Sequence, residues 1–93
     1  MKVKRNTLAR AFLALTSEAE VNAFFDDLCT IREVEEMANR FEIAMLLAEG
    51  KTFTEIEKAT GASSATISRV NRCLKYGEGY QSVLKRMENT DTE

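Results

Sequence analysis

The chain of 93 residues contains no proline and only four glycines. Proline and glycine are the residues that interrupt helices most strongly, so their scarcity leaves long stretches free to be helical. Apolar residues recur three and four positions apart, which is the spacing of amphipathic helices. We therefore predict an all-α fold of about six helices.

Two helices are predicted in the first thirty residues. The first begins after Asn6, a candidate N-cap, and covers Thr7 to Leu15. The second begins after Thr16–Ser17, where glutamates at the start of the helix favour the positive end of its dipole. The aromatic residues here and in the next helix are interpreted as core and dimer interface: Phe12, Phe24, Phe25 and Phe41.

A third and longest helix is predicted from about Ile31 to Glu49. Thr30 and Glu33 have the T-x-x-E spacing of a capping box, in which each residue satisfies a backbone N–H of the other. Gly50 follows the last apolar position and ends the helix. Its wide apolar stripe is typical of a central, buried helix.

Residues 52–76 have the pattern of a helix-turn-helix. Thr52 and Glu55 form a second capping box, and the short helix that follows ends at Thr60. Gly61 stands where a left-handed residue is required. Ser63 can then cap a helix from Ser64 to about Tyr76, and two helices joined by so short a turn define the motif.

We predict that residues 1–93 form one domain. It divides into dimerisation helices over residues 1–50, the helix-turn-helix over 52–76, a C-terminal helix over 79–87 and a frayed tail over 88–93. A domain of this length buries only about 60–65% of the surface that its unfolded chain exposes, and this chain holds no disulfide framework. We therefore expect a homodimer.

Positive charge is concentrated in two segments although the net charge is −2. Residues 1–10 carry four basic residues and residues 61–76 carry three, with no acid in either, which leaves a net −9 on the remainder. A local basic face is sufficient for contacts to nucleic-acid phosphates. The alternative is that these charges only solvate helix surfaces.

The two sides of the second helix of the motif differ in chemistry. Ile67, Val70 and Leu74 share one side and are expected to face inward. Small, hydroxyl-bearing and basic residues share the other side, and these types read base edges or hold phosphates in the major groove. The candidate DNA-contacting residues of the motif are Thr54, Lys58, Ser63, Ser64, Ala65, Thr66, Ser68, Arg69 and Arg72. The alternative is a structural or adaptor dimer that uses the motif to bind protein.

Catalytic and metal-binding functions are disfavoured by composition. The chain lacks histidine, and its adjacent acid pairs point in different directions on a helix. Cys29 and Cys73 are interpreted as small buried apolar residues in a reducing compartment. Neither a signal peptide nor a membrane span is apparent. We expect a soluble, cytoplasmic protein that is not an enzyme and binds no metal.

Three segments resemble the Trp-repressor-like superfamily. They are the run from Phe24 to Thr30, the helix around Arg40, and the run from Thr66 to Leu74, and they are most similar to the bacterial YerC/YecD branch. The resemblance implies six helices, an intertwined homodimer formed largely by the N-terminal helices, and binding to a two-fold symmetric DNA operator.

The same resemblance implies a ligand pocket. The two arginines that enclose the tryptophan corepressor in the Trp repressor match Arg40 and Arg69, and Thr30 matches a residue lining that pocket. Val70 replaces a family glycine, and Cys73 replaces a pocket serine. A branched side chain at position 70 is expected to narrow the indole slot. We therefore expect no cofactor, with a tryptophan-like corepressor as the alternative.

Overall fold

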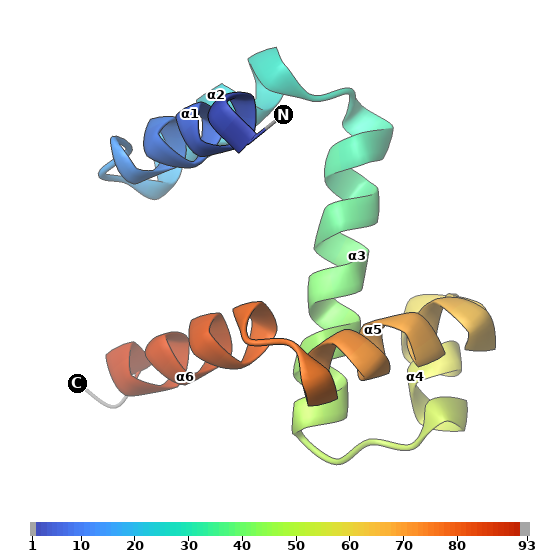
Figure 1. The fold of residues 1–93 in the computed structure, drawn as a ribbon. Coiled ribbons are helices and arrows are strands. Elements are labelled where there is room, and N and C mark those ends of the chain that lie inside the picture. Colours follow the sequence, from blue (N-terminus) through green and yellow to red (C-terminus); the bar gives the residue numbers. More distant parts are fainter. Residues whose placement is uncertain (1, 92–93) are drawn as a thin grey trace. The chain divides into compact units, whose positions relative to one another are not determined.

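The computed structural model describes the backbone of residues 2–91 and the side chains of residues 4–89. The described residues form α-helices and no strand (Figure 1), which confirms the predicted all-α class. None of these helices is both long and apolar enough to cross a membrane. The helices are α1 (Lys2–Leu13), α2 (Glu18–Leu28), α3 (Ile31–Ala48), α4 (Phe53–Thr60), α5 (Ser64–Tyr76) and α6 (Gly79–Asp91).

The chain forms two compact units, residues 1–34 and residues 35–93. The division falls within α3. The physical reason is that only the second half of α3 carries buried side chains, Ile43 and Ala44, which belong to the core of the second unit. Each unit is described separately.

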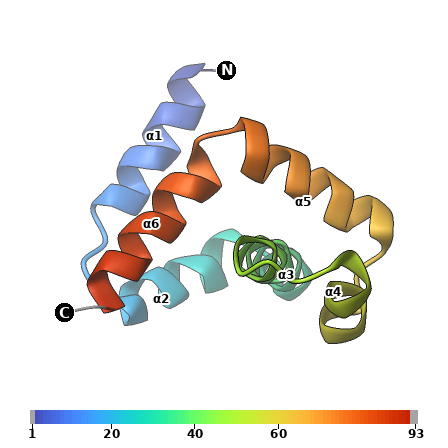
Figure 2. The same cartoon turned by 90° about the horizontal axis from the view of Figure 1, so that it is seen from below.

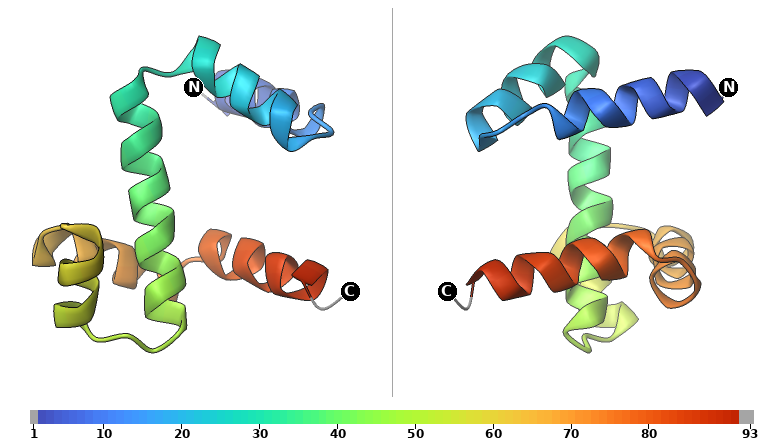
Figure 3. Two further views of the ribbon diagram at one scale, coloured as in Figure 1. Left: turned by 180° about the vertical axis from the view of Figure 1, so that it is seen from behind. Right: turned by 60° about the vertical axis from the view of Figure 1, so that its left-hand side comes forward.

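The first unit reverses the chain between α1 and α2 (Figure 3). The ring of Phe12 lies 5.2 Å from that of Phe24 and 5.9 Å from that of Phe25, so the two helices share an aromatic cluster. Ser17 caps α2 as predicted, its hydroxyl accepting from the Glu20 N–H. The predicted start of the first helix is wrong: Asn6 lies inside α1, because the helix begins at Lys2.

The second unit is built on a small apolar core. Five fully buried side chains come from three helices, so the core joins the C-terminal half of α3 to α4 and α5. Figure 2 looks along α3 and shows α4 and α5 beside its C-terminal end. The buried residues are Ile43, Ala44, Ile56, Ile67 and Val70, and Leu46, Leu47, Ala62, Tyr80 and Leu84 pack against them.

Helix α6 packs against this core through Tyr80 and Leu84. Tyr80 stacks on Phe41 of α3 at a ring distance of 6.5 Å. The amide of Gln81 donates to the Leu74 carbonyl and so ties α6 to the end of α5. The predicted end at Met87 is too early, because the helix continues to Asp91. The predicted frayed tail is therefore helical over residues 88–91, and residues 92–93 lie outside the described part.

Candidate nucleic-acid interface

Two capping structures fix the first helix of the motif. The Thr52 hydroxyl accepts from the Glu55 N–H at 3.2 Å, and the Glu55 carboxylate accepts from the Thr52 N–H at 2.8 Å. These two bonds confirm the predicted capping box and set the start of α4. At the other end Gly61 has φ of +74°, the left-handed conformation that the sequence predicted, and its N–H donates to the Glu57 carbonyl.

The turn between the two helices is held by hydroxyl groups. Thr60 donates to the Ile56 carbonyl at 2.7 Å and accepts from the Ala62 N–H at 3.2 Å. The Ser63 hydroxyl accepts from the Thr66 N–H at 3.2 Å and lies 3.1 Å from the Thr66 hydroxyl. Ser63 is therefore the N-cap of α5, as predicted. The hydroxyls of Ser63 and Thr66 are engaged with each other in this cap.

Burial gives α5 one inner and one outer side. Ile67 is 0% exposed and Val70 is 2% exposed, while Leu74 is partly buried, which places the predicted inward side against the core. The opposite side is open over its whole length. The candidate DNA-contacting residues are exposed at Thr54, Lys58, Ser63, Ser64, Ala65, Ser68, Arg69 and Arg72, and Thr66 is partly buried.

The carboxylate that caps α4 has a lowered pKa. The Thr52 backbone N–H, followed by the Thr52 hydroxyl, holds the pKa of Glu55 below its ordinary value of about 4.5. Glu20 in the first unit has a lowered pKa for the same reason, because it accepts from the backbone N–H and the hydroxyl of Thr16. Each carboxylate is therefore more stable in its charged form when its helix is formed.

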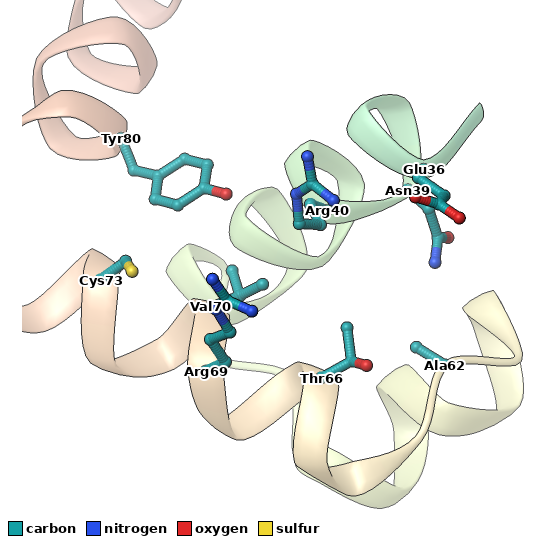
Figure 4. A pocket seen from close by; sticks show the side chains of 9 residues that line it. All are labelled: Glu36, Asn39, Arg40, Ala62, Thr66, Arg69, Val70, Cys73 and Tyr80. Carbon is teal, nitrogen blue, oxygen red and sulfur yellow. The ribbon is translucent and has the colours of Figure 1, made fainter. Parts of the chain in front are cut away.

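A cavity of about 530 Å³ adjoins the outer side of α5. Figure 4 shows Arg40 of α3 and Arg69 of α5 on opposite walls, with the Tyr80 ring projecting from α6. The two arginines that the sequence paired are thus brought to one pocket. The lining residues are Glu36, Asn39, Arg40, Ala62, Thr66, Arg69, Val70, Cys73 and Tyr80.

Thr30 is the third residue of the predicted pocket, and its side chain is exposed. It lies in the first unit, where its hydroxyl accepts from the Glu33 N–H and its own N–H donates to the Glu33 carboxylate. Sequence reasoning missed Asn39, Ala62 and Tyr80 as lining residues. Tyr80 is distant from the motif in sequence, and only the packing of α6 brings it to the cavity.

Val70 and Cys73 line the cavity from α5. Val70 is buried in the core, as its place on the inward side of α5 predicts, and it also lines the cavity, which remains open. The prediction that Cys73 is buried is wrong, because its side chain is exposed at the edge of the cavity, while Cys29 is partly buried. Cys73 lies one turn after Arg69 on α5, so the two share the cavity side of the helix rather than the core side.

Comparison with known proteins matches nearly the whole chain. A family model described as Trp repressor protein matches residues 4–88. The uncharacterized protein YerC of Bacillus subtilis is 51% identical over 87 residues, which are 92% of this chain and 84% of that protein. A TrpR-like protein from Eubacterium eligens has a TM-score of 0.85 at 46% identity, covering 89% of this chain and 87% of its own. A candidate Trp repressor from Staphylococcus aureus has a TM-score of 0.87 at 40% identity, covering 92% of this chain and 87% of its own.

Proposed function

The chain belongs to the Trp repressor family, and from this premise we propose that it is a sequence-specific transcriptional regulator that binds DNA as a homodimer. The observation that carries the proposal is the outer side of α5, which is exposed, basic and free of acidic residues. Its N-terminal half presents Ser64, Ala65 and Ser68, whose small side chains permit close approach to a major groove. A DNA partner implies action in the cytoplasm of a bacterial cell.

Arg69 and Arg72 have the principal role in this mechanism. Guanidinium groups bind guanine edges and phosphates through paired hydrogen bonds. Both side chains are exposed on the same side of α5, and the helix that holds them is anchored by Ile67 and Val70 in the core. In a homodimer, two such helices enter successive major grooves about 34–36 Å apart.

The dimer is supported by apolar surface on the first unit. Leu13 is 83% exposed and Ile31 is 80% exposed, and among the described residues of this unit none is fully buried. Exposed apolar side chains in such number mark an interaction surface. A second copy of the chain is the partner that also supplies the second DNA-binding helix.

Substitution of both arginines tests the DNA-binding role. We expect Arg69→Ala with Arg72→Ala to abolish specific binding to DNA fragments recovered by genome-wide selection, because each contact contributes about 1–3 kcal/mol. Gel shift measures binding, and circular dichroism checks that the helices are retained. Arg32→Ala with Lys85→Ala removes the same charge from exposed positions outside the motif and serves as the control. Normal binding by the folded Arg69 and Arg72 variant would refute this role of α5, whereas no detectable DNA binding by the unsubstituted protein at low salt would favour the adaptor alternative.

We propose further that DNA binding does not require tryptophan. The open cavity and its two arginines favour a small carboxylate-bearing effector, and Arg69 couples that cavity to the DNA-contacting side of α5. Val70 places a branched side chain where the family has glycine, which opposes an indole ring. Gel shift measures the affinity of the protein for a selected DNA fragment with and without L-tryptophan. Equal affinity supports this proposal, and tighter DNA binding with tryptophan refutes it.

A further inference from the structure

Helix α1 carries a second cationic surface that the proposed mechanism does not use. Lys4, Arg5 and Arg10 are exposed, and no acidic residue occurs in the sequence before Glu18. Residues 1–10 carry four basic residues, the larger number of the two acid-free basic segments, in a chain whose net charge is −2. A concentration of positive charge on an otherwise acidic protein favours a polyanionic partner.

The fold of the first unit gives Lys4 and Arg5 no structural role. The aromatic cluster with α2 is made by Phe12, about two turns further along α1. Arg10 differs, since it donates to the Thr7 hydroxyl at 3.3 Å and lies in the last turn, where a cation stabilises the helix dipole. Lys4 and Arg5 lie near the first turn, where a cation opposes the dipole.

An anionic membrane is a poorer partner for this surface than a nucleic acid. Membrane-surface helices combine basic residues with a free apolar side that enters the lipid. In α1 Phe12 packs against two rings of α2, and the exposed Leu13 belongs to the surface that the proposed homodimer would bury, so the apolar side of α1 is assigned to protein contacts rather than to lipid. Duplex DNA requires only positive charge, because it presents a phosphate every few ångströms along its surface.

We propose that Lys4 and Arg5 of α1 bind the phosphate backbone of duplex DNA as a second, sequence-independent contact. This inference rests on the proposed function, and it assigns DNA contacts of two kinds to two surfaces of the protein. The outer side of α5 selects the sequence, whereas α1 raises affinity for any duplex. Contacts of this kind release counterions, so they strengthen the salt dependence of binding without altering specificity.

The test is Lys4→Gln with Arg5→Gln in the full chain, with Arg32→Gln and Lys85→Gln as the charge-matched control. Fluorescence anisotropy measures the affinity for a random-sequence duplex and for a selected fragment over a series of salt concentrations. We expect about tenfold weaker binding to both duplexes and a log–log salt slope shallower by about one to two. The ratio of the two affinities stays that of the unsubstituted protein.

The outcomes separate this inference from the proposed function. If the unsubstituted protein binds neither duplex at low salt, the proposed function itself fails. If it binds both and the Lys4 and Arg5 variant has the affinity and slope of the control, only the α1 contact is refuted. If the Lys4 and Arg5 variant loses the ability of the unsubstituted protein to bind vesicles containing anionic lipid while its DNA affinity is unchanged, the α1 contact with DNA is refuted and a membrane is the partner of this surface.

Discussion

At the scale of single residues, the geometry of the helix-turn-helix depends most on Gly61. Its φ of +74° lies in the left-handed region, which L-residues with a Cβ occupy at a cost. No heavy atom lies within 4 Å of a Cβ built at this position, so the cost arises from the backbone and not from crowding. The hydroxyls of Thr60 and Ser63 then hold the turn that follows.

We expect Gly61→Ala to lower the free energy of unfolding by about 1–2 kcal/mol. Urea denaturation followed by circular dichroism measures the change. Gly79→Ala is the matched control, because Gly79 begins α6 at a negative φ and a Cβ there also meets nothing within 4 Å. A Gly61 variant as stable as the Gly79 variant would show that the left-handed turn is not strained.

At the scale of helices, local capping determines where most of them begin and end. Four capping structures were predicted from sequence because each depends on residues three positions apart. They are the caps at Ser17, Thr52 and Ser63 and the reciprocal Thr30–Glu33 bonds. The ends of α1 and α6 were predicted less well. The N-cap assigned to Asn6 was wrong, and the predicted end at Leu15 lies two residues beyond the observed end at Leu13. Hydrophobic spacing placed the end of α6 at Met87, four residues before its observed end at Asp91.

The cap of α4 makes stability depend on pH. The hydrogen bonds from Thr52 lower the pKa of Glu55 in the folded state, so its contribution is present above the unfolded carboxyl value. It is lost as the pH falls below about 4.5 toward the folded pKa. We expect Glu55→Gln to lose less stability than the unsubstituted protein between pH 7 and pH values of about 3.

Urea denaturation across that pH range measures this effect. Glu49→Gln is the control, since Glu49 is an exposed carboxylate outside the capping boxes. The capping account predicts that this control follows the unsubstituted protein. If the Glu49 and Glu55 variants respond alike to acid, the charged cap does not contribute to the pH dependence.

At the scale of the whole molecule, charge and apolar surface are distributed unevenly. The core of the second unit is formed within one chain, whereas the first unit leaves Leu13 and Ile31 largely exposed. Sequence periodicity identifies the apolar residues of each helix but does not show which of them a single chain can bury. The cavity was incompletely predicted for the same reason: Arg40 and Arg69 were found by resemblance, while Tyr80 and Asn39 required the packing of three helices.

We expect Leu13→Asp with Ile31→Asp to convert the proposed homodimer to a monomer. Burying two carboxylates in an apolar interface is strongly unfavourable. Sedimentation velocity measures the mass, and Asn22→Asp with Ala23→Asp, at exposed positions of α2, is the control with the same added charge. A monomeric unsubstituted protein, or a variant that remains dimeric, would contradict the proposed interface.

The central claim is that the outer side of α5 binds DNA with sequence preference. The most direct measurement is the affinity of the unsubstituted protein and of the Arg69→Ala, Arg72→Ala variant for a selected fragment and a random duplex. We expect the unsubstituted protein to bind the selected fragment at least about tenfold more tightly than the random duplex, and the variant to lose that preference. Equal affinity of the two proteins for the selected fragment, with both folded, would contradict it.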